Sequence, residues 1–262
     1  MSPGVSRCTA GDIATTELYA LLPDTPAVEA HAHLADRGFD VAPVVDDESP
    51  RGYVKRDELP SAESTGTVEE YTCGITLQHL IAPTADFETT LEALYDRPRY
   101  FIGSQNSVRG IVTRADLNGE AARVHLFTHI SELEEKLRTV IRNKQPDWKT
   151  RTPLHSEEVD RIEERYQEAR QNNVELPEIH YAQFSTLETI ISNSKACWQA
   201  CGFNDARTVE HQLNRIVELR NDVVHSNLIV QNTERGMLEE GRTVTKLLEE
   251  YTYIKRLLSH LE

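Results

Sequence analysis

The sequence has few cysteines, no long hydrophobic run and a shortage of positive charge. Four scattered cysteines in 262 residues are too few for a disulfide scaffold, so we expect them to be reduced. Nowhere do about 18 consecutive apolar residues occur, and the first residues lack the apolar stretch of a secretory signal. We therefore expect a cytoplasmic protein that neither spans a membrane nor is exported by that route.

The charge is strongly acidic. With 43 acidic and 28 basic residues the formal net charge is -15, so the chain has no general attraction for nucleic acid or anionic membrane. Most basic residues are arginine and the acidic excess is spread along the chain, which is typical of a surface adapted to high salt and predicts a halophilic source. The length and a change of turn signals near Asn118 predict two domains, residues 1–118 and 119–262.

The first half contains a repeat. Residues 51–59 (RGYVKRDEL) realign with residues 109–117 (RGIVTRADL). In each copy a helical stretch (28–38 and 89–97) precedes an apolar strand (41–45 and 100–102), a polar turn, a short strand after the glycine and another helix start. This order predicts a β-α-β-β-α unit repeated twice, over about residues 12–60 and 71–118.

Residues 110–117 (GIVTRADL) resemble the signature G-(I/V)-V-T-x-x-D-L of cystathionine-β-synthase (CBS) repeats. The resemblance implies a tandem CBS pair whose cleft takes an adenine nucleotide as a regulatory ligand, such as AMP, ATP or S-adenosylmethionine. It also implies a set of ligand-binding residues: Thr113 at the phosphate, Asp116 at the ribose, and Tyr100, Phe101 and Ile102 along the purine.

The first copy departs from this signature. Lys55 replaces the threonine and Glu58 replaces the aspartate, which leaves Lys55 as a point charge for a phosphate. A second interpretation of Thr113 and Asp116 is that they cap the helix after them, as Thr and Asp commonly do. The pair would then be a dimerisation scaffold without a ligand.

From Glu120 onward the pattern is helical. Apolar residues spaced by three and four predict a helix over 120–143, and similar signals predict helices over 156–171 and 181–201. Asp205 caps a further helix, and a last one runs from about Glu234, through Met237, to the C terminus. The fold class is therefore α+β: tandem repeats followed by an all-α bundle of four or five helices.

Residues 220–225 (RNDVVH) resemble the motif of HEPN domains, an Arg followed after four to six residues by a His. The resemblance implies a metal-independent endoribonuclease that leaves 2′,3′-cyclic phosphate and 5′-hydroxyl ends and requires no cofactor. His225 would be the general base, Arg220 would neutralise the phosphorane, and Asn221 would orient one of them, since histidine titrates near neutrality and arginine stays charged.

Helix geometry separates these residues. At about 100° per residue, Asn221 and His225 share a face, whereas Arg220 lies about 140° from His225. Either the helix unwinds between them or the site is shared across a homodimer, which we expect because HEPN domains form such dimers as a family. A purely structural interpretation remains: Arg220 anchors an ion pair to Glu134 or Glu135, and His225 caps a helix end.

The leading hypothesis is a ribonuclease, toxin or stress effector, gated by nucleotide at the CBS repeats and contacting RNA through Arg207, His211 and Arg215. The helix over 120–143 joins the two domains directly, so we expect it to transmit the effect of the nucleotide to the helical domain. The alternative is a non-catalytic nucleotide sensor whose helical domain binds a protein or RNA partner. A third possibility is an antitoxin partner that modifies Tyr251 or Tyr253. No metal site is expected.

Overall fold

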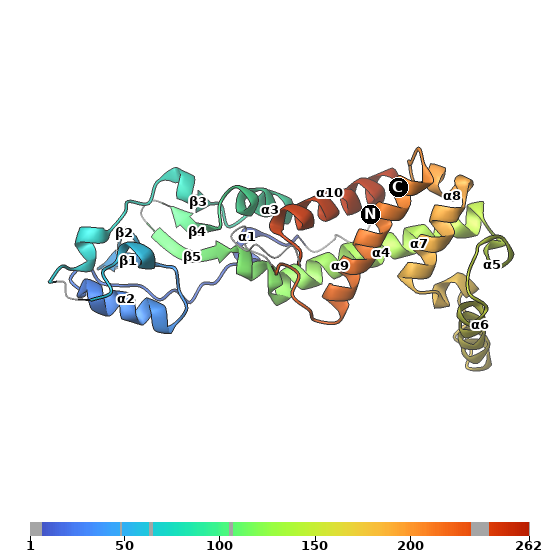
Figure 1. Cartoon of the computed structure of the whole chain (residues 1–262), viewed down its shortest axis with the longest axis horizontal. Coiled ribbons are helices and arrows are strands. Elements are labelled where there is room, and N and C mark those ends of the chain that lie inside the picture. Colours follow the sequence, from blue (N-terminus) through green and yellow to red (C-terminus); the bar gives the residue numbers. More distant parts are fainter. Residues whose placement is uncertain (1–6, 48, 63–64, 105–106, 232–240, 262) are drawn as a thin grey trace. The chain divides into compact units, whose positions relative to one another are not determined.

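The computed structural model describes residues 7–47, 49–62, 65–104, 107–231 and 241–261 (Figure 1). Its contacts divide the chain into two compact units, residues 1–122 and 123–262. The first unit is mixed α/β and the second is helical. Among the described residues, no helix has the length and apolar character needed to cross a membrane.

The first unit holds two copies of one arrangement, each a helix followed by an antiparallel strand pair. Copy one comprises α2 (Ala27–Asp36), β1 (Val41–Asp46), β2 (Ser49–Lys55) and the 3-10 turn η1 (Arg56–Glu58). Copy two comprises β3 (Leu80–Ile81), α3 (Phe87–Asp96), β4 (Arg99–Ser104), β5 (Ser107–Thr113) and the 3-10 turn η4 (Arg114–Asn118). The register shifts at equivalent places, between Val44 and Val45 and between Ile102 and Gly103.

The predicted β-α-β-β-α order needs two corrections. The leading strand of copy one is a single bridge between Leu21 and Val44, whereas β3 pairs with β4 over two residues. The closing helix of each copy is only a 3-10 turn. In copy one Pro60 disfavours a helical conformation at Leu59, and in copy two Gly119 is extended and ends η4.

The two copies exchange their leading segments. Residues 9–15, with α1 (Ala10–Ile13), pair with copy two through the bridges Thr9–Asp86 and Thr15–Ile111. Residues 66–73, with the 3-10 turn η2 (Val68–Tyr71), pair with copy one through Pro26–Thr67 and Tyr53–Cys73. The hydrophobic core of copy one therefore combines residues of copy one with Val68 of the exchanged segment. Its buried members are Leu21, Ala27, Ala30, Leu34, Ala42, Val44, Val54, Leu59 and Val68.

The second unit consists of helices. These are α4 (Glu120–Lys144), α5 (Trp148–Arg151), α6 (Ser156–Gln171), the 3-10 turn η5 (Glu178–Tyr181), α7 (Phe184–Asn193), α8 (Lys195–Ala200), α9 (Ala206–Val224) and α10 (Val244–His260). Helix α9 packs against α7, α8 and α10. The apolar stripe predicted on α4 is buried, with Leu126, Leu133 and Leu137 fully inaccessible to solvent. The helical character predicted for this half is therefore confirmed.

Two predicted helix boundaries were wrong. The segment 181–201 is two helices, because Ser194 is extended and its hydroxyl accepts from the Cys197 amide to start α8. The last helix begins at Val244, where the Thr243 hydroxyl accepts from the Lys246 amide. Glu234 and Met237 lie outside the described residues. The segment between the predicted helices 120–143 and 156–171 contains the short helix α5.

Candidate functional site

Thr113 and Asp116 form a tight local structure at the start of η4. The Asp116 carboxylate accepts from the Thr113 amide at 2.6 Å and from the Thr113 hydroxyl at 2.7 Å. Its other oxygen accepts from the Thr15 hydroxyl at 3.0 Å, so the exchanged leading segment also contacts it. The capping role foreseen for these residues is present, on a 3-10 turn. The three side chains place two hydroxyls and one carboxylate together.

Copy one has the same arrangement with different chemistry. The Lys55 ammonium lies 2.6 Å from a Glu58 carboxylate oxygen, and the Cys73 thiol lies 3.8 Å from the other oxygen. Cys73 and Thr15 occupy equivalent places, because each pairs with the strand that precedes the turn. The hydrogen bond from Lys55 to Glu58 raises the pKa of Lys55. In this copy the carboxylate is therefore already neutralised by a permanent cation.

The expected purine-lining residues are buried. Tyr100, Phe101 and Ile102 are all less than a tenth exposed. The Phe101 ring lies 5.5 Å from the Tyr53 ring of copy one, and Tyr53 in turn lies 5.4 Å from the His79 ring. These aromatic contacts join the two copies. These side chains are used for packing, and β4 lies between β3 and β5 in the sheet.

Sequence reasoning missed a group of cations near these aromatics. Burial lowers the pKa of His79, and the positive charges of Arg97 and Lys55 lower it further. Both charges therefore lie near the His79 ring. The Arg97 guanidinium also donates to the Gln78 side chain at 3.1 Å. No spacing in the sequence signals this group, because its members come from both copies.

The signature glycines allow close approach of the exchanged segments. A Cβ at Gly52 would lie 2.2 Å from the Cys73 carbonyl oxygen, and one at Gly110 would lie 3.0 Å from the Thr15 carbonyl oxygen. Real Cβ atoms essentially never approach other atoms more closely than 3.0 Å. The glycines thus hold the strand against the leading segment that brings Cys73 or Thr15 to the carboxylate.

In the helical unit, the Arg-to-His motif spans the end of α9. His225 is the residue that ends the helix, its amide donates to the Asn221 carbonyl at 2.9 Å, and both side chains are exposed. Arg220 lies 3.7 Å from the Glu134 carboxylate and 3.4 Å from the Asn221 side-chain oxygen. The structural role foreseen for Arg220, an ion pair with Glu134, is present. Of the three predicted catalytic side chains, Asn221 and His225 are exposed and Arg220 is half-buried.

Two arginines, the half-buried Arg123 and the buried Arg242, fix this end of α9. The Arg123 guanidinium donates to the carbonyls of Asp222 and Val223 at 2.9 and 3.0 Å, and to that of Asn227 at 2.9 Å. Arg242, only 6% exposed, lies 2.6 Å from the Asp222 carboxylate and 2.7 Å from Glu250. Cations at a helix C terminus satisfy its unpaired carbonyls. Neither arginine stands out in the sequence.

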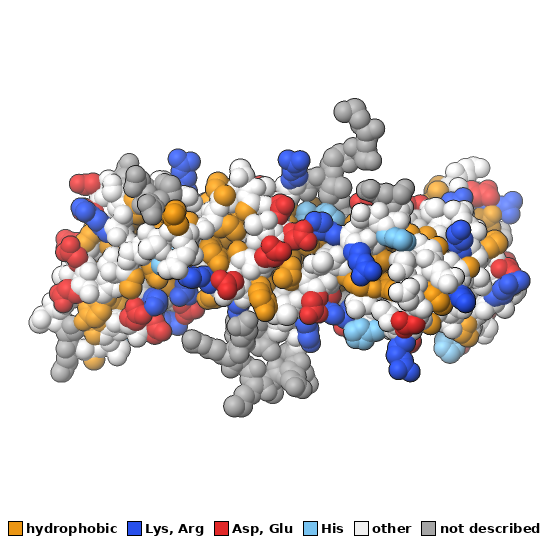
Figure 2. Space-filling model, turned by 90° about the horizontal axis from the view of Figure 1, so that it is seen from above, with side chains coloured by type: hydrophobic (Ala, Val, Ile, Leu, Met, Phe, Trp, Pro, Cys, Tyr) orange, Lys and Arg blue, Asp and Glu red, His pale blue; other side chains and the backbone are white. Residues whose placement is uncertain are grey.

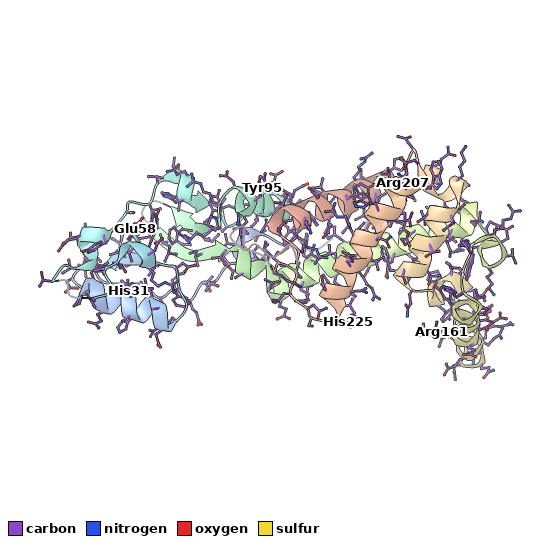
Figure 3. All side chains as sticks on the ribbon, viewed as in Figure 1. His31, Glu58, Tyr95, Arg161, Arg207 and His225 are labelled. Carbon is purple, nitrogen blue, oxygen red and sulfur yellow. The ribbon has the colours of Figure 1, made fainter. Side chains whose placement is uncertain are left out.

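The predicted RNA stripe is not continuous. Arg207 and His211 are exposed, but Arg215 lies 2.8 Å from Glu249 and 3.4 Å from the buried Glu250. Arg207 lies at the opposite end of α9 from His225 (Figure 3). On the face shown in Figure 2, basic and acidic side chains are intermingled. Arg215 therefore belongs to the contact between α9 and α10, where it is a counter-charge to the buried Glu250.

Comparison with known proteins gives a family match for part of the first unit. Residues 10–62 match the family model of the CBS domain. This span includes copy one and the leading segment that packs on copy two. The chain therefore carries a CBS domain followed by a helical region. No curated protein matches the chain.

Several solved structures are similar to the N-terminal part. CBSX2 from Arabidopsis thaliana is 18% identical with a TM-score of 0.38, covering 45% of this chain and 97% of that one. The putative acetoin utilization protein AcuB from Vibrio cholerae is 18% identical with a TM-score of 0.38, covering 44% and 91%. CbpB, solved in complex with c-di-AMP, is 20% identical with a TM-score of 0.34, covering 46% and 83%.

Proposed function

We propose that the N-terminal unit is a regulatory module that binds an adenine nucleotide beside Thr113 and Asp116, and that the helical unit is the part it controls. The observation that carries this proposal is the cluster of the Thr15 hydroxyl, the Thr113 hydroxyl and the Asp116 carboxylate within a CBS fold. A ribose hydroxyl can donate to Asp116, and a phosphate oxygen can accept from Thr113, in place of the present local bonds.

Copy one is the weaker site for a ribose. The Glu58 carboxylate already accepts from Lys55, and its second neighbour is a thiol, which is a weak donor. Lys55 and Arg97 supply positive charge beside the His79 ring, near the junction of the copies, where a phosphate is attracted. We therefore assign the ribose to copy two and an auxiliary phosphate contact to Lys55.

Helix α4 connects the Thr113 and Asp116 site to the motif at residues 220–225 along the chain. Asp116 lies in η4, the Gly119 amide donates to the Asp116 carbonyl at 2.9 Å, and α4 begins at the next residue. Arg123 follows in the first turn of α4 and binds the last carbonyls of α9. A ligand that changes η4 would bias the Arg123 contacts if the two states differ in affinity for it. The ligand state would thereby reach Asn221 and His225.

The binding proposal is tested by calorimetry of the full chain with AMP, ATP and S-adenosylmethionine. We expect Asp116→Ala to weaken binding at least tenfold, or about 1.4 kcal/mol. Glu58→Ala, which removes the equivalent carboxylate of copy one, is the matched control and should retain binding within about threefold. Absence of heat with all three nucleotides, or equal loss in both variants, overturns the proposed site.

The coupling proposal is tested by hydrogen exchange with and without the nucleotide that binds. In the wild type, we expect the amides of residues 221–227 to change their exchange rates on binding. In Arg123→Gln the nucleotide should still bind, but this response should disappear because the carbonyls of α9 are no longer held. An unchanged response in Arg123→Gln contradicts the route through α4.

A second function, metal-independent RNA cleavage, is favoured by one observation: the His225 imidazole is exposed beside Asn221 at a helix end. Arg220 is held by Glu134, so a phosphate must displace that carboxylate or meet an arginine of a second subunit. Such a homodimer would supply the arginine that the motif needs at the phosphate. An antitoxin partner would inhibit the cleavage. The non-catalytic alternative needs neither step.

Labelled RNA incubated with the protein in EDTA, with and without nucleotide, separates these two functions. Cleavage that yields 2′,3′-cyclic phosphate ends and is lost in His225→Ala, but not in His155→Ala, supports the ribonuclease. His155 is a matched control because it is also an exposed histidine beside a helix end. Equal behaviour of wild type and His225→Ala leaves the non-catalytic sensor as the function.

A further inference from the structure

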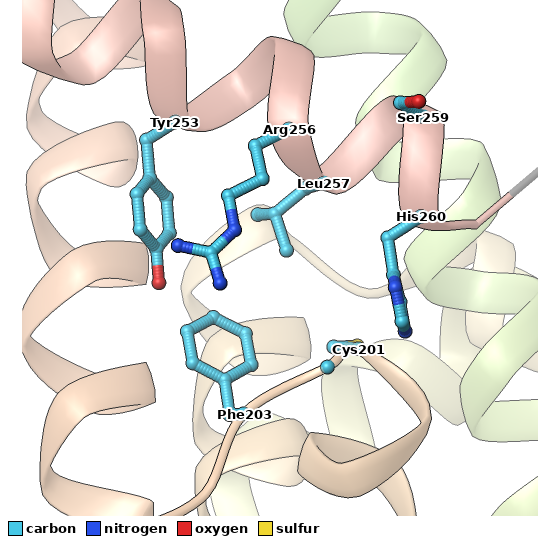
Figure 4. A pocket seen from close by; sticks show the side chains of 8 residues that line it. Cys201, Phe203, Tyr253, Arg256, Leu257, Ser259 and His260 are labelled. Carbon is cyan, nitrogen blue, oxygen red and sulfur yellow. The ribbon is translucent and has the colours of Figure 1, made fainter.

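A pocket of about 390 Å³ lies in the helical unit, on residues that the proposed function does not use (Figure 4). It is formed by the loop after α8 and the last turns of α10. Its lining comprises Cys201, Gly202, Phe203, Tyr253, Arg256, Leu257, Ser259 and His260. This volume is in the range of about 300–1,000 Å³ that is typical of small-molecule sites.

One part of the lining is apolar and built into the core. Phe203, Leu257 and Cys201 are each less than a tenth exposed, and the Phe203 ring lies 5.9 Å from the Tyr253 ring. Burial raises the pKa of the Cys201 thiol to about 12, so this thiol stays neutral. Gly202 makes the turn with a positive φ of 79°, and a Cβ there would lie 3.0 Å from the His260 ring. The backbone and His260 therefore enclose one side.

The polar part of the lining contains no carboxylate. Within the described part of the chain, Arg256 has no ion-pair partner, although acidic residues outnumber basic ones in the sequence. Its guanidinium and the Tyr253 hydroxyl both point toward the Phe203 ring in Figure 4. Burial raises the pKa of Tyr253 to about 12, which keeps the hydroxyl protonated as a donor at neutral pH. Arg256, Tyr253 and Ser259 thus all offer donors.

We propose that this pocket binds a small aromatic monocarboxylate. Its carboxylate would accept from the Arg256 guanidinium and the Tyr253 hydroxyl, and its ring would lie against Phe203 and Leu257. A single permanent cation matches one negative charge, which favours a carboxylate over a phosphate dianion. Because the whole chain is acidic, selection for an anion must come from these local donors. The pocket is separate from the motif and needs no nucleotide.

Ligand-observed NMR on the full chain tests the proposal, with benzoate and the neutral analogue benzyl alcohol observed by proton saturation transfer and inorganic phosphate observed by 31P line broadening. We expect saturation transfer to benzoate alone, and an affinity for benzoate at least tenfold lower in Arg256→Gln. Arg256 is exposed, so this variant should fold, which circular dichroism checks. Arg207→Gln, an exposed arginine of the same unit outside the pocket, is the matched control and should bind as the wild type does.

Three results would overturn the proposal: no transfer to benzoate, equal transfer to benzyl alcohol, or an unchanged affinity in Arg256→Gln. Broadening of the 31P line of phosphate with no transfer to benzoate would assign the donors to a different ligand class and would also refute it. The test is independent of nucleotide binding and RNA cleavage.

Discussion

The two copies in the first unit share a backbone plan and differ in the side chains at one turn. Both place a glycine under the exchanged leading segment and a carboxylate at the following turn, within reach of that segment. Copy two uses Thr113 and Asp116, which are bonded to each other and to the Thr15 hydroxyl without a cation. Copy one uses Lys55 and Glu58, whose charges satisfy each other. The comparison shows that the repeat maintains the packing, whereas ligand chemistry depends on the two turn positions.

The signature glycines give the largest expected difference between the copies. In Gly52→Ala the new Cβ meets a carbonyl oxygen at 2.2 Å, so the leading segment must move; in Gly110→Ala the nearest oxygen is at 3.0 Å. We expect losses in unfolding free energy of about 3 kcal/mol and about 1 kcal/mol respectively, as for overpacked cores. Urea denaturation measures both. Equal losses would show that the copies tolerate their segments alike.

Replacing the turn residues of copy one with those of copy two should enable both copies to bind a nucleotide. With Lys55→Thr and Glu58→Asp together, copy one gains the hydroxyl and short carboxylate of copy two. We expect calorimetric stoichiometry to rise from one nucleotide per chain toward two. If binding stays at one per chain, the difference between the copies lies elsewhere, with Cys73 in place of Thr15 as the next position to exchange.

A substitution in the turn of copy two should lower the free energy of unfolding more than the equivalent substitution in the turn of copy one. Asp116→Asn removes a charged acceptor from two hydrogen bonds of a capping box and should cost about 1 kcal/mol. Glu58→Gln removes one partly exposed ion pair and should cost less than about 0.5 kcal/mol. Thermal unfolding without nucleotide compares the two variants. A larger loss in Glu58→Gln would reverse the proposed roles of capping and ion pairing.

The smallest expected effect concerns the leading segment that packs on copy two. Hydrogen bonds from Thr9 lower the pKa of the Asp12 carboxyl below its usual range. A carboxyl whose pKa is lower in the folded state stabilises the protein above its unfolded pKa and loses this effect as the pH falls through the folded pKa. Asp12→Asn should therefore differ from the wild type at pH 6 and converge with it near pH 2. A constant difference would contradict this linkage.

The sequence predicted local features well and non-local ones poorly. The repeat, the strands and the helical second half follow from periodicity and from turn residues near one another in the chain. The exchange of leading segments could not be predicted, because Thr15 reaches Asp116 through a contact between distant residues. Likewise, Ser194 breaks a helix whose apolar pattern continues across it, since one capping hydroxyl outweighs the pattern.

The candidate motif in the helical unit shows the same limit. Helical geometry predicted that Arg220 and His225 diverge, and an ion pair from Arg220 to Glu134 was one of the foreseen alternatives. The contacts of Arg123 and Arg242 were not foreseen, because an arginine far from the motif in sequence carries no signal of its partner. Whether the motif cleaves RNA stays a prediction, since residue type alone cannot fix the approach of two side chains.

The exchanged segments also determine how the first unit can fold. Neither copy contains all of its own sheet contacts: residues 9–15 need copy two, and residues 66–73 need copy one. Closing these contacts requires most of the unit to be ordered at once, which makes them costly in loop entropy and late to form. The unit should therefore unfold in one cooperative step, and a fragment ending at residue 62 should not fold alone.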